Sequence, residues 1–274
     1  MDSTSVALNF IELNPERSNT IILLHGLTGS HLEWEQVQAS LVDYHLLIPD
    51  LPQHSGSRKV RPLTIRHATA ACAGLIQDHA HGSQAYAVGI SMGGAIFISG
   101  TYDMKRAFTK GMYALPWVSA FIRDFVPSRV DQEQHRKKGI MWSPAFTRDA
   151  RDNSRLSIVR QGAREIRHFD LTRLVVTQRT LAVATGRMDS ADEVAALVGI
   201  LKRGHATSTG AYVEEAEHQW DLQRPELFAA GILAWFEHGD LPEEYRPLTW
   251  AGIEPIRRSG TSMAHIRWPV EKHN

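Results

Sequence analysis

Cysteine is nearly absent from this sequence, since Cys72 is the single one among 274 residues. One cysteine excludes a disulfide within the chain. This fits a reducing compartment, and we expect a cytoplasmic protein. Cys72 lies among apolar residues at helical spacing, so the pattern predicts a packing role for its side chain.

Long apolar runs and an excess of either charge are also missing. No stretch reaches the roughly 18 uncharged apolar residues that a membrane span requires, and the first residues lack the basic and apolar segments of a signal peptide. The 30 basic and 30 acidic residues cancel, so no net charge attracts a polyanion. We therefore expect neither a membrane nor a nucleic acid as partner, and the oligomeric state stays open.

Patterns that bind metals, phosphates or dinucleotides are absent too. His25, His54 and His218 could suggest a metal site, but the sequence has no His-x-x-x-His spacing and no cysteine cluster. No phosphate loop and no G-x-G-x-x-G follows an expected strand. We expect no metal and no cofactor.

Alternating strand and helix patterns are present, and they predict an α/β fold with a mostly parallel sheet. Thr64 and a Ser190–Glu193 capping box mark two helix starts, and Pro225 opens the last helix. Strands are expected at residues 6–13, 21–24, 45–49, 85–88, 107–114, 180–184 and 211–213, and apolar helix faces at residues 34–41, 65–76, 194–201 and 228–236.

The pattern changes between residues 116 and 177, where charged residues and aromatics mix and no strand is evident. We interpret this stretch as a helical cap inserted into a core formed by residues 1–115 and 178–240. Residues 241–274 have no clear period and are expected to form a C-terminal extension. Candidate substrate contacts are the aromatic residues Trp117, Phe121, Trp142 and Trp220, with ordinary core packing as the alternative.

The most informative motif is Gly89-Ile90-Ser91-Met92-Gly93, a G-x-S-x-G pentapeptide. A strand-like apolar run precedes it, and a helical pattern follows it. Small glycines let the chain turn sharply between these elements, which presents the Ser91 hydroxyl at the edge of a sheet. The motif predicts that Ser91 is a nucleophile.

A serine nucleophile requires a base, and the base requires an acid that orients it. Asp189 follows an expected strand and a glycine turn, so it is the predicted acid; a helix-capping role is the alternative for it, and Asp124 is the alternative acid. His218 follows the last expected strand and is the predicted base. The order Ser91, Asp189, His218 fits a hydrolase elbow.

A developing oxyanion requires hydrogen-bond donors. The backbone N–H of Met92, directly after the nucleophile, is one expected donor. The other is the N–H of Leu27, in the loop that follows residue 24. Gly26 would let this loop turn back over the elbow.

Four segments together resemble the α/β-hydrolase superfamily over residues 6–238. They are the stretches 25–30, 50–54, 89–94 and the His218-x-Trp220 pair with Pro225-x-x-Phe228. The resemblance implies an eight-stranded, mostly parallel sheet with a helical cap before the acid-bearing strand, and no cofactor. The sequence departs from the family at Gln53 and Ser55, where many members have glycine.

The superfamily contains esterases, lactonases, thioesterases, C–C bond hydrolases, cofactor-free haloperoxidases and some lyases, so the resemblance leaves the reaction open. We expect a serine hydrolase of a small-molecule ester, lactone or thioester. The first alternative is C–C cleavage or elimination with the same triad, which a cationic cap would favour; its candidates are Arg123, Arg148, Arg151, Arg155 and Arg160. The second is a non-catalytic ligand-binding module.

Residues 29–34 and 50–52 also resemble the menaquinone-pathway SHCHC synthase, which eliminates pyruvate. That family has an arginine directly after the two glycines of the elbow, where this chain has Ala95. The departure disfavours that activity here.

Overall fold

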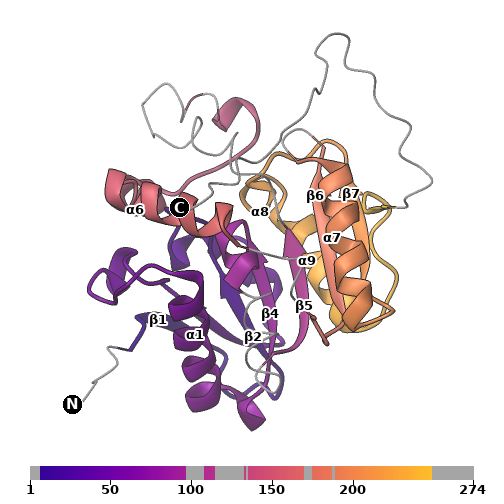
Figure 1. The fold of residues 1–274 in the computed structure, drawn as a ribbon, viewed down its shortest axis with the longest axis horizontal. Coiled ribbons are helices and arrows are strands. Elements are labelled where there is room, and N and C mark those ends of the chain that lie inside the picture. The colour runs from indigo at the N-terminus through magenta and orange to yellow at the C-terminus, as the bar shows by residue number, and fades with distance from the viewer. Residues whose placement is uncertain are drawn as a thin grey trace, which may run out of the picture.

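An eight-stranded sheet with helices on both faces forms the centre of the protein (Figure 1). The computed structural model describes residues 7–96, 108–114, 133, 135–169, 175–186 and 189–248. The strand order is β1-β3-β2-β4-β5-β6-β7-β8. The strands are β1 (Phe10–Leu13), β2 (Thr20–Leu24), β3 (His45–Pro49), β4 (Ala85–Ile90), β5 (Phe108–Ala114), β6 (Thr180–Thr185), β7 (Thr209–Val213) and β8 (Arg246–Pro247).

Pairing is parallel from β3 through β7, and antiparallel only where β1 meets β3 and β8 meets β7. The predicted mostly parallel sheet is therefore confirmed. Parallel neighbours end at the same edge of a sheet, so the loops after β2, β4, β6 and β7 meet there.

The helices pack on both faces of the sheet. Alternate residues of β2 point to opposite sides: Ile22 and Leu24 belong to the core under α1 and α7, and Ile21 and Leu23 to the core under α9. The α-helices are α1 (Ile65–His79), α5 (Pro144–Asn153), α6 (Leu156–Arg167), α7 (Ala191–Gly204), α8 (Trp220–Gln223) and α9 (Pro225–Phe236), and the 3-10 helices are η1 (His31–Trp34), η2 (Gln38–Ser40), η3 (Ser55–Ser57) and η4 (His81–Ser83).

The expected helix starts are present. The Thr64 hydroxyl accepts the His67 N–H at 3.1 Å, the Ser190 hydroxyl accepts the Glu193 N–H at 3.4 Å, and Pro225 is the first residue of α9. Cys72 is fully buried in α1, as its spacing indicates.

The expected helix at residues 34–41 differs, because two 3-10 helices, η1 and η2, replace it. Trp34, Val37 and Leu41 are nevertheless all buried. Their spacing of three and four residues satisfies both kinds of helix, so the apolar pattern could not separate them.

The domain predictions concern two regions, the cap and the C-terminal extension. The predicted cap contributes α5 and α6, while residues 116–132 lie outside the described residues, so the domain boundaries stay predictions. The predicted C-terminal extension begins inside the fold: β8 pairs with β7, and the buried Tyr245 donates a hydrogen bond to the Leu227 carbonyl at 3.2 Å. A two-residue strand has no period to detect, which is why the sequence pattern missed it.

In the described ranges, no helix combines the length and apolar character needed to cross a membrane.

Two helix glycines give a test of this packing. A Cβ on Gly231 of α9 would overlap the Tyr245 ring, whereas a Cβ on Gly199 of α7 would meet nothing within 4 Å. We expect Gly199→Ala to stabilise by about 0.5–1 kcal/mol, because alanine is the better helix former. Gly231→Ala should destabilise by roughly 1–3 kcal/mol through overpacking. Thermal unfolding measures both; equal shifts of the same sign would contradict the docking of Tyr245.

Candidate active site

Ser91 lies in a strained turn between β4 and the helical residues 92–96. Its φ is 54°, in the left-handed region that non-glycine residues seldom adopt. A Cβ on Gly93 would overlap the Leu24 carbonyl oxygen, and one on Gly89 would lie 2.5 Å from the Gly93 carbonyl carbon. This is the strand–turn–helix geometry that the pentapeptide predicts, and it leaves Ser91 at the carboxyl edge of the sheet with 6% of its surface exposed.

A tight turn formed by residues 26–29 lies beside this elbow. The Gly29 N–H donates to the Gly26 carbonyl at 3.1 Å, and Thr28 has a φ of 71°, as at the third position of a type II turn. A Cβ on Gly26 would lie 3.6 Å from the Ser91 Cβ. The turn predicted to stabilise an oxyanion is therefore so close to the elbow serine that an added methyl group at Gly26 would touch it.

Three of the four N–H groups in this turn are committed to protein acceptors. Gly26 donates to Glu33 Oε2 at 3.0 Å, Thr28 donates to His54 Nε2 at 3.1 Å, and Gly29 donates within the turn. The N–H of Leu27 donates no hydrogen bond among the described residues, and the same holds for the N–H of Met92. These are the two predicted oxyanion donors.

Two buried histidines hold the loops around the turn. His25 Nε2 accepts the Leu51 N–H at 2.9 Å, so the proton of the ring is on Nδ1, which donates to the Gly26 carbonyl at 2.7 Å. His54 Nδ1 donates to the Pro52 carbonyl at 2.9 Å. Burial lowers the pKa of His25 to about 4 and that of His54 to about 3, so both rings are neutral at pH 7.

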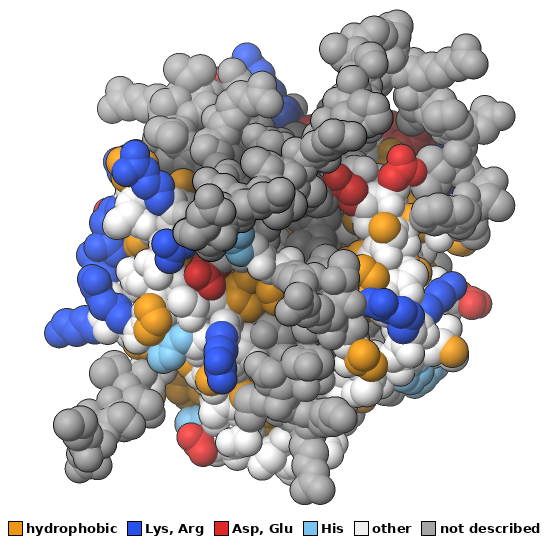
Figure 2. Space-filling model, in the orientation of Figure 1, with side chains coloured by type: hydrophobic (Ala, Val, Ile, Leu, Met, Phe, Trp, Pro, Cys, Tyr) orange, Lys and Arg blue, Asp and Glu red, His pale blue; other side chains and the backbone are white. Residues whose placement is uncertain are grey.

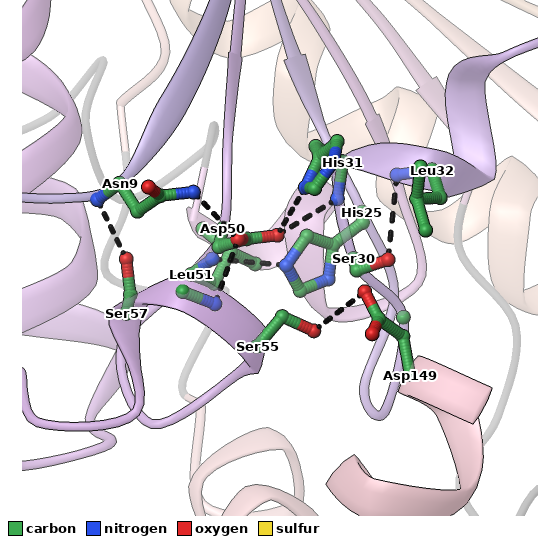
Figure 3. Close-up of polar contacts among 12 residues, drawn as sticks. Asn9, His25, Ser30, His31, Leu32, Asp50, Leu51, Ser55, Ser57 and Asp149 are labelled. Carbon is green, nitrogen blue, oxygen red and sulfur yellow. Dashed lines mark hydrogen bonds and ion pairs between the residues drawn. The ribbon is translucent and has the colours of Figure 1, made fainter. Parts of the chain in front are cut away.

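Asp50 anchors the neighbouring loop (Figure 3). Its Oδ1 accepts the backbone N–H and the Nδ1 of His31, both at 2.9 Å, and its Oδ2 accepts hydrogen bonds from Asn9 and from the Gly56 N–H. Burial opposes the charge, but the hydrogen bonds from His31 lower the pKa of Asp50 to about 2. The hydrogen bond between the His31 ring and Asp50 raises the pKa of His31.

Asp189 and His218 lie together after β6 and β7. Asp189 Oδ2 accepts the backbone N–H and the hydroxyl of Thr185, each at 2.8 Å, which fixes the carboxylate. Its Oδ1 is 3.9 Å from His218 Nδ1 and accepts no hydrogen bond within the described part of the chain. Burial raises the pKa of Asp189 to about 7 and lowers that of His218 to about 4. Asp124, the alternative acid, lies outside the described residues.

Glu33 and Asp221 form a pair of buried acidic residues, and Glu33 contacts the turn formed by residues 26–29. Glu33 accepts the Gly26 N–H, and burial raises its pKa to about 7. Both carboxylate oxygens of Asp221 are buried without a hydrogen-bond partner in the described residues. Burial, and then the charge of Glu33, raise the pKa of Asp221 well above its usual value.

The predicted substrate aromatics have different outcomes. Trp220 is fully buried and packs against Phe228 and Tyr245 at ring distances of 4.5 and 5.5 Å, which favours the alternative of ordinary core packing. Trp142 stacks on His135 and lines a cavity of about 170 Å³, which leaves its role open. Trp117 and Phe121 lie outside the described residues.

The arginines of α5, α6 and the residue between them face outward. Arg148, Arg151, Arg155 and Arg160 are all exposed, and Arg123 lies outside the described residues. Figure 2 shows Lys and Arg side chains on the outer surface at the side of the molecule where α6 lies. The four described arginines are too exposed to line a buried cationic pocket of the kind that the first alternative reaction would require.

Sequence reasoning missed several residues that shape the site. The loop-anchoring role of His25 and His54 is not predicted from the sequence, although His25 directly follows β2 and His54 lies in the loop after β3. The buried positions of Glu33, Asp221 and Asn153 carry no signal in the sequence. In the ranges that the structure describes, no cluster of three or more His, Cys, Asp or Glu side chains is suited to a metal ion.

Comparisons with known proteins agree with this fold. The model of the alpha/beta hydrolase family matches residues 21–231. An AB hydrolase superfamily protein of Gibberella zeae is 25% identical over 247 residues, covering 82% of this chain and 83% of that protein.

Two solved structures are similar in fold. A lipase-esterase related protein from Clostridium acetobutylicum has a TM-score of 0.65 at 16% identity, covering 84% of this chain and all 100% of the other. The 2-hydroxy-6-oxo-6-phenylhexa-2,4-dienoate hydrolase from Rhodococcus sp. strain RHA1 has a TM-score of 0.61 at 15% identity, covering 84% and 100%. At these identities the likeness shows the shared fold and not the reaction.

The buried acid pair predicts how stability depends on pH. The unfolded chain ionises Glu33 and Asp221 near their ordinary pKa values, whereas the folded protein keeps their protons to higher pH. The folded state therefore binds more protons between about pH 4 and 7, and stability falls as the pH rises through that window.

We expect Asp221→Asn to raise the Tm at pH 8 and to flatten this dependence, because an amide does not titrate and unfolding of the variant no longer releases a proton from position 221. Each 1 kcal/mol gained in the free energy of unfolding should raise the Tm by roughly 2–4 °C. The control is Asp152→Asn, at a carboxylate that is 64% exposed. Calorimetry at pH 5 and pH 8 measures the effect, and a lower Tm at pH 8 for Asp221→Asn would contradict it.

Proposed function

The chain belongs to the alpha/beta hydrolase family, and we propose that it is a serine hydrolase that cleaves a small carboxylic ester, lactone or thioester. The observation that carries the proposal is the uncommitted N–H of Leu27 beside Ser91, because a turn with its other N–H groups occupied presents one donor to a developing oxyanion. The elbow strain at Ser91 supports it, since strained backbone concentrates at functional sites.

The proposed reaction proceeds through an acyl-enzyme. The Ser91 hydroxyl attacks the carbonyl carbon while His218 takes its proton, and the N–H groups of Leu27 and Met92 stabilise the negative oxygen. His218 then protonates the leaving group. Water, activated by His218, attacks the acyl carbon, and Ser91 leaves as the carboxylic acid is released.

Asp189 orients His218 in this scheme. His218 Nδ1 and Asp189 Oδ1 are 3.9 Å apart, beyond a hydrogen bond, so a small movement of the His218 loop would complete the contact. Two hydrogen bonds from Thr185 hold the carboxylate in place meanwhile.

The alternative of C–C cleavage or elimination has less support. Arg148, Arg151, Arg155 and Arg160 are exposed, and Ala95, where the similar synthase family has arginine, is buried. No observation favours a cationic pocket among the described residues.

Labelling of Ser91 tests the proposal. We expect a fluorophosphonate to modify the folded protein at Ser91, and Ser91→Ala to lose this labelling together with about 10⁴-fold or more of the kcat for short p-nitrophenyl esters. Mass spectrometry locates the label. Ser30→Ala, which removes another buried hydroxyl, is the control and should keep the labelling. Unlabelled folded wild-type protein would overturn the proposal.

The pH dependence of catalysis follows from Asp189. Below its pKa of about 7 the protonated side chain cannot stabilise a positive His218, whereas above it the carboxylate can. His218, with a pKa lowered to about 4, is already neutral in this range. We therefore expect kcat/KM to rise with pH through about 7 and then level off.

Asp189→Asn should lower kcat/KM by roughly 10³- to 10⁴-fold and abolish this step. The measurement is a pH–rate profile of both proteins between pH 5 and 9. The same step in the asparagine variant would show that another group titrates.

A further inference from the structure

Asn153, the last residue of α5, joins three segments through one side chain. It is fully buried. Its Nδ2 donates to the Gly29 carbonyl at 2.8 Å and to the Ser55 hydroxyl at 2.9 Å, while its Oδ1 accepts the Ser55 N–H at 2.9 Å. A buried amide with both ends paired in this way specifies one relative position of α5, the oxyanion turn and the loop at Ser55.

The loop on which α5 docks is strained at the positions where this sequence departs from its family. Gln53 has a φ of 67° and Ser55 a φ of 36°, the left-handed region that suits the glycines of many family members. Such strain costs on the order of 1–3 kcal/mol per residue unless the surroundings hold it.

Contacts to α5, α6 and Arg155 hold these two strained residues. The Ser55 hydroxyl donates to Asp149 Oδ2 at 3.0 Å (Figure 3), the Gln53 amide donates to Gln161 Oε1 at 3.3 Å, and Arg155 donates to the Gln53 carbonyl at 3.4 Å. A glycine at position 55 would adopt this backbone more easily but could not make the hydroxyl contacts. Gln53 and Ser55, the two positions where the sequence departs from its family, therefore lie where α5 and α6 contact the core.

The same two helices also contact the residue that supplies the oxyanion donor. Gly29 closes the turn that carries the Leu27 N–H, and Asn153 holds it by its carbonyl. The Leu27 side chain lies against Gly162 of α6, so closely that a Cβ at Gly162 would overlap it. α5 therefore contacts the turn at Gly29, its last residue, and α6 contacts it at Leu27.

We propose that Asn153 is a positioning residue that fixes the oxyanion turn against α5, so that α5 and α6 form a fixed wall of the active site and do not swing away as a lid. The role in catalysis rests on the proposed serine hydrolase function. Displacing α5 would leave the buried Gly29 carbonyl and the Asn153 amide without partners, which opposes opening. Since the oxyanion forms only in the transition state, the loss of Asn153 should lower kcat and leave KM nearly unchanged.

The test compares Asn153→Asp with Ser55→Gly and Asp152→Ala. Asn153→Asp keeps the shape and the acceptor for the Ser55 N–H but removes the donor to the Gly29 carbonyl and to the Ser55 hydroxyl. Ser55→Gly removes hydroxyl contacts to α5 and relieves backbone strain, yet leaves the Asn153–Gly29 bond. Asp152→Ala removes an exposed ion pair with Arg58, at 3.4 Å, from the same helix.

We expect Asn153→Asp to lower kcat for a p-nitrophenyl ester by roughly 10- to 100-fold, less than the loss of a whole oxyanion donor, with KM within about twofold. Its affinity for an alkyl boronic acid, which forms a tetrahedral adduct on serine, should fall by a similar factor. Affinity for the carboxylate product should not change. The two control variants should keep kcat within about twofold.

Hydrogen–deuterium exchange separates this inference from the proposed function. Peptides that cover residues 26–29 should exchange faster in Asn153→Asp than in either control, whether or not the protein hydrolyses esters. Wild-type protein without Ser91-dependent activity would overturn the proposed function, and exchange would then decide the role of Asn153. Unchanged exchange, or unchanged kcat and boronate affinity in an active enzyme, would overturn the inference. If Asn153→Asp does not fold, Asn153→Ala takes its place in both measurements.

Discussion

The close approach of two backbones, at Gly93 and the Leu24 carbonyl, is the constraint on which the site depends. No side chain fits between them, because any Cβ at Gly93 would overlap the carbonyl oxygen. This approach brings the helix after β4 against the end of β2, and so brings Ser91 beside the turn that follows β2. Ser91 and this turn are neighbours because glycine permits that distance.

The two buried histidines beside the turn carry no charge at pH 7. His25 and His54 are neutral rings whose two nitrogens each join a loop, so they act as rigid connectors and not as acids, bases or metal ligands. Their tautomers follow from the backbone groups that they contact. In the same region Asp50 keeps its charge because it accepts hydrogen bonds from three residues, whereas neither carboxylate oxygen of Asp221 finds a hydrogen-bond partner of good geometry in the described part of the chain. Hydrogen bonding, more than depth, decides which buried carboxylate is ionised.

The helices α5 and α6 are part of this polar framework. Asn153 of α5 donates to the carbonyl of Gly29, and Gly162 of α6 lies against the side chain of Leu27. Both helices thus contact the turn formed by residues 26–29. Changes within α5 are therefore expected to alter the position of that turn.

Local pattern was sufficient for much of the fold. The alternation of apolar runs, the caps at Thr64 and Ser190 and the G-x-S-x-G turn determined the α/β class, most of the strands and the position of Ser91, because each depends on neighbours a few residues away. The order of Asp189 and His218 along the chain placed both after late strands, where the structure finds them close together.

Contacts between distant segments were decided only by the tertiary structure. The pairing of Arg246–Pro247 with β7, the core position of Trp220 and the bridge from Asn153 to Gly29 join residues that are far apart in sequence, and no periodicity encodes them. The protonation of the buried groups belongs here as well, since Asp189, Glu33 and His25 acquire their pKa values from surroundings that exist only in the folded protein. The sequence by itself determined that Ser91 lies in the tight turn after β4. Only the folded chain decided which residues surround it, because those contacts join segments that are far apart in sequence.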